Sequence, residues 1–230
     1  TIQTIQKPTR ARALDTSGNN NHGQIYSGRA LEFDGVADYL SVSAATETDF
    51  SFWHIDNKTT VACWINLNSY KDETLWFATN SGQTSRLGLQ VGADGEISFD
   101  TYNGTSYTNT GGGAEGTKIV ELNTWYRIVC TCDNNSLQLY INGVLQTGTA
   151  NAYASPLSTT NSNSVRIGYR NDIYYDGMMC NFQAWDALWT ADDALYDYLN
   201  PEQLALNRGG TSLTNSNLKL WYPMNDGHRG

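Results

Sequence analysis

The chain has 230 residues, of which 40% are hydrophobic, 12% aromatic and 16% charged; this composition supplies a core, excludes a disordered chain and suits one large all-β domain. The formal charge of −9, from 14 Lys and Arg against 23 Asp and Glu, argues against nucleic acid and anionic lipid as partners. No stretch approaches the ~20 consecutive apolar residues of a membrane-spanning helix, so we expect no membrane partner.

Alternating side chains predict most of the chain to be β-strand. In TTVACWINL, residues 59–67, the alternate residues Val61, Cys63, Ile65 and Leu67 fall on one face, as in a strand that faces a core. The same alternation runs through RLGLQV, residues 86–91, and EISFDTY, residues 96–102. Asp94-Gly95 between these two segments predicts a hairpin turn.

A three-strand antiparallel meander is predicted over residues 125–146. The segments WYRIVCTC, LQLYI and VLQ alternate in the same way, and Asn142-Gly143 tolerates the positive φ angles of a type I′ turn. VRIGY, residues 165–169, and MMCNFQAW, residues 178–185, follow as two more predicted strands.

One helix is predicted after the last of these strands. In TADDALYDYL, Thr190 can cap the N-terminus, Asp193 three residues on forms a variant of the capping box, and Pro201 marks a break. Many short strands, abundant Gly and Asn turns and a single late helix favour an all-β fold, an antiparallel two-sheet sandwich with one short C-terminal helix.

The four cysteines, Cys63, Cys130, Cys132 and Cys180, lie inside apolar strand-like segments. This placement is typical of buried free thiols. Cys130 and Cys132 are two residues apart on one predicted strand, so their Cα atoms lie roughly 6.6 Å apart and are poorly oriented for a disulfide. We therefore expect four reduced thiols, in a protein synthesised in a reducing cytoplasm.

Five sequence blocks follow one another along the chain: LDTSGNNNHGQI, GRALEFDGVADYLSV, TTVACWINL, LNTWYRIVCTCDNNSLQLYINGVLQ and VRIGYRNDIYYDGMMCNFQAWDALWTADDAL. In this order they resemble the laminin G-like branch of the concanavalin A-like lectins and glucanases. The resemblance implies a concanavalin A-like jelly roll and three parts of the chain. These are a linker or edge strand over residues 1–13, a laminin G-like sandwich over residues 14–199, and a connector with a C-terminal strand over residues 200–230.

The C-terminal segment LKLWYPMNDG, residues 218–227, resembles a strand that comes first in similar domains. Two interpretations stay open: it begins a following repeat, or it folds back as an added edge strand. Its resemblance to repeats of phage tail fibres and bacterial surface proteins implies a virion or extracellular surface location. A neighbouring structural protein is then an expected partner, and homo-oligomer formation is left open.

Glucanases of similar fold carry E-x-D-x-x-E on one strand, and no such string occurs here. The nearest pair, Glu96 and Asp100, is separated by roughly 13 Å along a strand, which exceeds the ~9.5 Å of an inverting glycosidase site. Both are expected to be solvent-facing polar positions. We therefore expect no enzyme activity, and a glucanase-type hydrolase ranks third among the candidate functions.

Calcium is the one cofactor that the resemblance implies, because similar sandwich lectins hold the ion with Asp and Asn oxygens from loops. The alternative is that these residues only form Asx and Asp-Gly turns. The candidate ligands are Asp15, Asn19, Asn21, Asp34, Asp38 and Asp176.

Sugar recognition requires an exposed aromatic ring for the C–H face of a pyranose, with amides and carboxylates around it. These residue types favour a non-catalytic recognition or adhesion module that binds a glycan or a neighbouring protein; the alternative is an architectural spacer without a ligand. The best local cluster comprises Tyr169, Asn171, Asp172, Tyr174 and Tyr175, and Trp76 is a further loop aromatic.

Overall fold

The computed structural model of the chain describes residues 30–43, 58–71, 73–79, 86–102, 107–109, 120–133, 137–146 and 164–224. One sheet contains β1 (Leu31–Asp34), β3 (Thr59–Leu67), β8 (Trp125–Cys132), β9 (Leu137–Ile141), β10 (Val144–Leu145), β14 (Asp176–Trp185) and β15 (Leu218–Tyr222). The other contains β2 (Leu40–Ser43), β4 (Glu73–Thr79), β5 (Arg86–Val91), β6 (Ile97–Tyr102), β7 (Tyr107–Asn109) and β11 (Ser164–Ile167).

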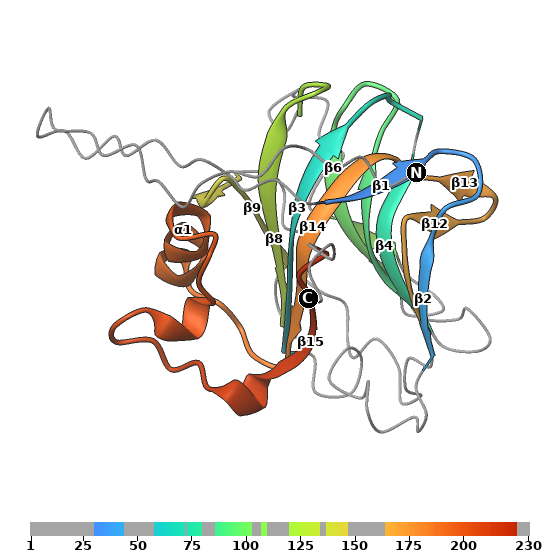
Figure 1. Ribbon diagram of the computed structural model, residues 1–230. Helices are drawn as coiled ribbons and strands as arrows, with labels where there is room; N and C mark the ends of the chain where they lie inside the picture. Colours follow the sequence, from blue (N-terminus) through green and yellow to red (C-terminus); the bar gives the residue numbers. More distant parts are fainter. Residues whose placement is uncertain are drawn as a thin grey trace, which may run out of the picture.

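The two antiparallel sheets face each other as the layers of a sandwich (Figure 1). Within the described ranges, the seven-stranded sheet has the order β1-β14-β3-β8-β9-β10, with β15 also paired to β14. The six-stranded sheet has the order β2-β11-β4-β5-β6-β7. The predicted all-β antiparallel sandwich is therefore confirmed.

The core lies between the sheets, because alternate side chains of each strand point inward. Val61 and Ile65 of β3 pack in one buried cluster with Leu87 and Leu89 of β5. Burying a side chain of this size contributes about 1.5–3 kcal/mol. The apolar residues that alternate along the sequence of each strand thus form the main core between the sheets.

Both predicted hairpin turns are confirmed. Asn142 and Gly143, between β9 and β10, have φ angles of 52° and 76°, the left-handed values that a type I′ turn requires. Gly95, between β5 and β6, has a φ of 87°. These two turns fix the register of the strands that they join.

The predicted helix is α1 (Ala191–Leu199), and it begins with the predicted capping box. The Thr190 side chain accepts the Asp193 N–H, and the Asp193 carboxylate accepts the Thr190 N–H. α1 lies on the outer face of the seven-stranded sheet (Figure 1), where it covers an apolar cluster that includes Val129 and Trp185. No helix in the described part of the chain has the length and apolar character needed to cross a bilayer.

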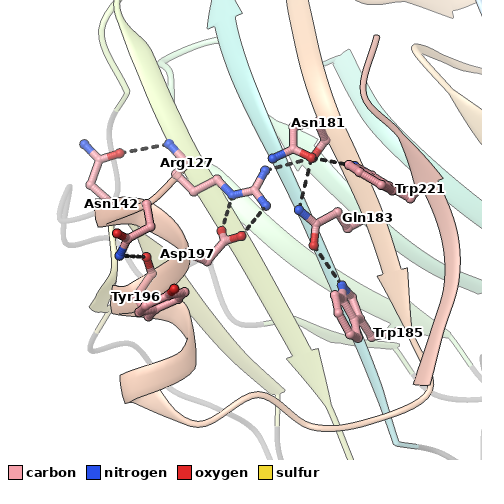
Figure 2. Close-up of polar contacts among 9 residues, drawn as sticks. Arg127, Asn142, Asn181, Gln183, Trp185, Tyr196, Asp197 and Trp221 are labelled. Atoms are coloured by element: carbon pink, nitrogen blue, oxygen red, sulfur yellow. Dashed lines mark hydrogen bonds and ion pairs between the residues drawn. The ribbon is translucent and has the colours of Figure 1, made fainter. Parts of the chain in front are cut away.

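A polar network, buried at Arg127 and Asp197, fastens α1 and β15 to this outer face (Figure 2). Arg127 of β8 contacts Asp197 of α1 and donates from Nη1 to the carbonyl oxygen of Asn181, at 2.9 Å. The side-chain oxygen of Asn181 accepts from Trp221 of β15 at 2.9 Å and from Gln183 at 3.1 Å. Because Asn181 belongs to β14, one strand anchors both the helix and the edge strand.

β15 folds back onto the edge of β14 that also carries β1. Tyr222 pairs with Phe182, and Leu31 of β1 pairs with Met179. The connection from α1 runs through the short 3-10 helices η2 (Ala205–Asn207) and η3 (Asn215–Asn217). In this structure the C-terminal segment therefore occupies the position of an added edge strand, one of the two interpretations of its sequence.

All four cysteines are buried free thiols, as the sequence predicts. Burial raises the pKa of the Cys63 and Cys180 thiols to about 12. It also raises the pKa of Cys130 and of Cys132 far above the usual value. Uncharged and enclosed, these thiols act as small apolar side chains.

Candidate ligand-binding site

Three tyrosine rings meet beside the loop that leads from β1 to β2. Tyr39 lies in this loop, while Tyr169 and Tyr174 lie on β12 (Tyr169–Arg170) and β13 (Ile173–Tyr174). The ring centroids are 4.7 Å apart for Tyr169 and Tyr174, 5.0 Å for Tyr39 and Tyr169, and 6.4 Å for Tyr39 and Tyr174. Tyr39 is 48% exposed and the other two are half-buried. These residues, the tyrosine cluster, form a partly exposed aromatic surface.

The β12–β13 hairpin places two of the three rings. Asn171 and Asp172 form its turn with φ angles of 51° and 63°, the conformation that Asn and Asp tolerate better than most residues. Tyr169 and Tyr174 are cross-strand partners, so their rings lie side by side. The Tyr169 hydroxyl donates to Asp172 Oδ1 at 3.2 Å, which holds the ring over its own turn.

The third ring, that of Tyr39, follows the turn after β1. Asp34 Oδ1 accepts the N–H groups of Val36 at 2.8 Å and Ala37 at 2.9 Å, and Asp38 Oδ2 accepts the Asp34 N–H at 3.3 Å. The backbone hydrogen bonds to Asp34 hold the pKa of its carboxyl below the usual value, and the bond from Ala37 has the largest effect. The turn is therefore an Asx-type structure that presents Tyr39 to the hairpin.

Charged and polar groups surround the cluster. The guanidinium carbon of Arg166 lies 5.3 Å from the centre of the Tyr169 ring, within the range of a cation–π contact. Partial desolvation, with the neighbouring Tyr169 and Asp172, raises the pKa of Tyr174, so its hydroxyl stays protonated at neutral pH. Phenol, carboxylate, amide and guanidinium groups can all bind the hydroxyls of a neutral ligand lying on the rings.

Four of the six predicted ligand-binding residues come together in this arrangement: Tyr169, Asn171, Asp172 and Tyr174. Tyr39 and Arg166 also belong to it and were missed. Tyr39 is close to the hairpin only because β2 pairs with β11, where Leu40 faces Ile167. The one signal in the sequence was an aromatic residue between an Asp-Gly turn and a short strand.

The other two predictions are wrong, because Tyr175 and Trp76 are 0% exposed. The Tyr175 ring packs 5.3 Å from that of Phe33 in the core, next to the exposed hairpin but turned away from it. Trp76 packs 5.9 Å from Phe99. A register shift between Thr74 and Trp76 in β4 brings this tryptophan into the core.

The three described calcium candidates are engaged in other contacts. Asp34 and Asp176 are cross-strand partners, but the Asp34 carboxylate binds its own turn, and Asp176 Oδ2 lies 3.1 Å from Lys71 Nζ. Asp176 also accepts hydrogen bonds from Asn68 and Ser69. The Lys71 ammonium group therefore balances the charge of the Asp176 carboxylate, as a metal ion would.

No group of three or more His, Cys, Asp or Glu residues suited to a metal ion occurs within the described ranges. The candidates Asp15, Asn19 and Asn21 lie outside those ranges. Calcium binding therefore stays a prediction.

The expectation that Asp100 faces solvent is wrong. Asp100 is 0% exposed on β6, where the side-chain amide of Gln90 lies 3.2 Å from Oδ1 and 3.3 Å from Oδ2. Glu96, by contrast, is half-buried beside the hairpin turn. The two carboxylates lie in different environments, and Asp100 is enclosed in protein.

Comparison with known proteins identifies the family. A laminin G family model, described as the concanavalin A-like lectin/glucanases superfamily, matches residues 33–194. Since the match covers most of the chain, the chain belongs to this superfamily. No curated protein sequence matches it.

Three solved structures show how widely the fold is shared. A native heptameric SAP-like pentraxin from Limulus polyphemus is 15% identical, over 73% of this chain and 80% of its own, with a TM-score of 0.52. Domain 4 of AbnA, a GH43 extracellular arabinanase from Geobacillus stearothermophilus solved with arabinotriose, is 17% identical. The match covers 62% of this chain and 66% of that domain, with a TM-score of 0.51. Domains LG4-5 of the mouse laminin alpha1 chain are 11% identical. The match covers 77% of this chain and 53% of that one, with a TM-score of 0.51. At these identities the likeness shows the fold alone.

Proposed function

We propose that this domain is a non-catalytic recognition module that binds a glycan through the tyrosine cluster. The observation that carries the proposal is the set of three contacting, partly exposed rings with Asp172 and Arg166 beside them. Sugars present an apolar C–H face and polar hydroxyls, which such a surface complements. The arabinotriose bound to the arabinanase domain supports a glycan as ligand.

A glycan array followed by calorimetry tests this proposal. Tyr174→Ala should weaken binding of any retained glycan about tenfold, a loss of about 1.4 kcal/mol. Tyr196→Ala is the matched control, because Tyr196 is a half-buried tyrosine on α1. Equal affinity for the wild type and Tyr174→Ala would move the glycan site elsewhere, and an array without a retained glycan would favour the second candidate.

The second candidate is an architectural module that contacts a neighbouring protein. An exposed aliphatic patch beside the edge strand β10 favours it: Val144 is 61%, Leu145 43%, Leu195 42% and Leu199 56% exposed. Leu195 lies against Gly143 of the β9–β10 turn, so helix and strand contribute to one surface. A self-association that Leu199→Lys abolishes, measured by light scattering, would support this role and homo-oligomer formation.

We further propose that the domain is one unit of a larger virion structural protein, such as a tail fibre, or of a surface protein. The resemblance of its C-terminal segment to such repeats supports this origin. Sequencing the gene on both sides of the segment that encodes this domain tests the proposal. Adjoining segments that resemble DTSGNNNHG would support a modular parent, and unrelated neighbouring sequence would oppose it.

A further inference from the structure

The outer face of the seven-stranded sheet contains a buried polar atom without a partner. Asn66 of β3 is only 5% exposed, and its side-chain oxygen is buried and forms no hydrogen bond. Leaving such an acceptor unpaired costs about 1–3 kcal/mol. Buried polar groups are nearly always paired in proteins, so an unpaired one is a candidate for pairing with a ligand.

Asn66 points away from the core. Its neighbours Ile65 and Leu67 belong to the cluster between the sheets, so the intervening side chain takes the opposite face. Trp64, two residues earlier on that face, lies 5.9 Å from the ring of Tyr198 on α1. The helix therefore reaches the level of Trp64, next to Asn66.

The strand register puts Asn66 in a row across four neighbouring strands. Glu32 of β1 pairs with Met178, Met178 pairs with Asn66, and Asn66 pairs with Trp125 of β8. Glu32 is exposed, while Met178 and Trp125 are half-buried. We call these four residues the Asn66 row. It spans roughly 14 Å, three strand spacings of ~4.8 Å.

The backbone beneath the row is fixed from inside. The Tyr175 hydroxyl lies 3.0 Å from the carbonyl oxygen of Asn66 and 2.8 Å from that of Met178. A Cβ at Gly177 would lie 2.2 Å from the Asn66 carbonyl oxygen, so β14 and β3 approach closely at this point. A rigid support of this kind holds side chains ready for a ligand.

We propose that the Asn66 row is a second glycan-binding site, separate from the tyrosine cluster. The Trp125 indole offers an aromatic face to the C–H groups of a pyranose, with Met178 extending the apolar surface. The Glu32 carboxylate accepts its hydroxyl hydrogens directly, and the Asn66 side-chain oxygen accepts one once the ligand displaces the side chains that cover it. Glu32 and the chain's formal charge of −9 favour a neutral sugar over an acidic one.

Nuclear magnetic resonance of the full chain, titrated with methyl glycosides of glucose, galactose and mannose, tests the site. We expect saturable shifts of the Trp125 indole N–H and the Asn66 side-chain amide with at least one of these probes. Asn66→Leu should abolish the Trp125 shift while holding or raising the melting temperature, because it removes an unpaired buried amide. Trp125→Phe should weaken binding and keep the fold.

Tyr174→Ala is the control for the two sites, since it should leave the Trp125 shift unchanged. Shifts confined to the tyrosine cluster would overturn the second site while supporting the first. Binding to Asn66→Leu at wild-type strength, or the absence of any Trp125 shift with all three glycosides, would also overturn it.

Discussion

Arg127 of β8 and Asp197 of α1 form a salt bridge in which both side chains are fully buried (Figure 2). Nε lies 2.5 Å from Oδ2 and Nη2 lies 3.1 Å from Oδ1, a two-pronged geometry. The third guanidinium nitrogen donates to the Asn181 carbonyl oxygen at 2.9 Å. The charge of Arg127 is thus neutralised by a residue 70 positions later in the chain.

Removing one partner of this pair should be severely destabilising. Asp197→Ala would leave the Arg127 charge buried and unpaired, at a cost of about 3–5 kcal/mol in the free energy of unfolding. Urea denaturation followed by tryptophan fluorescence measures the loss.

Two controls separate this effect from ordinary surface electrostatics. The double variant Arg127→Met, Asp197→Leu should recover most of the stability, because no unpaired charge remains. Asp186→Ala, which breaks the more exposed 3.6 Å contact with Lys219, should cost less than about 1 kcal/mol. A wild-type denaturation midpoint for Asp197→Ala alone would contradict the structural role of the pair.

The capping residue Asp193 should contribute to acid sensitivity. Partial burial acts to raise the pKa of its carboxyl, but hydrogen bonds from Thr190 and Arg208 outweigh burial and hold that pKa below 3.8. A carboxyl with a lowered pKa in the folded state stabilises the fold above its unfolded pKa, and this stabilisation is lost as the pH falls through the folded value.

Asp193→Asn should therefore lower stability at pH 7 by about 1 kcal/mol and flatten the loss of stability as the pH falls below about 4. Melting temperatures across this range measure both effects. Asp192→Asn is the control, because that side chain is 81% exposed. Identical dependence of the melting temperature on pH for the wild type and Asp193→Asn would show that the Asp193 carboxyl does not contribute to acid sensitivity.

Gly177→Ala should destabilise the sandwich, whereas Gly209→Ala should not. The added Cβ at Gly177 would lie 2.2 Å from the Asn66 carbonyl oxygen and 2.8 Å from the Tyr175 hydroxyl, and the one at Gly209 would meet nothing within 4 Å. Overpacking of this kind costs about 1–3 kcal/mol, while an open surface position changes stability by about 0.5 kcal/mol or less. Thermal denaturation of the two variants side by side would decide, and equal melting temperatures would refute the close approach of β3 and β14.

Calcium binding is testable through stability. An ion that binds only the folded state at 100 times its Kd adds about 2.7 kcal/mol, so a chelator should lower the melting temperature by several degrees. Asp15→Asn should weaken the response if the N-terminal loop holds the ion, and Asp176→Asn should matter less because Lys71 occupies that carboxylate. A melting temperature unaffected by both chelator and added calcium would exclude a structural calcium ion.

Local patterns predicted most of the elements, because alternation and turn chemistry are properties of neighbouring residues. β3, the Asn142-Gly143 turn and the Thr190 capping box follow from such short segments. The site depended on features that no short segment contains. Tyr174 and Tyr175 are adjacent and chemically alike, and only the tertiary fold determines that one is half-buried on the hairpin and the other fully enclosed.

Pairing across long sequence distances accounts for the remaining misses. The shift in β4 that buries Trp76 cannot be inferred from alternation, since a bulge changes which side chains face inward. Arg127 looks like a polar strand residue until α1 brings Asp197 over it. The contact between Tyr39 and the hairpin likewise requires β2 to lie next to β11.

The shared edge of β14 has a consequence for how the domain could be joined to others. β15 and β1 both run antiparallel to β14, and the end of β15 at Tyr222 and the start of β1 at Leu31 face positions 182 and 179 of that strand. Three residues of strand correspond to roughly 10 Å, so these two strand ends lie close together on one flank of the sheet. A domain joined through either strand would therefore attach at the same flank of the sheet.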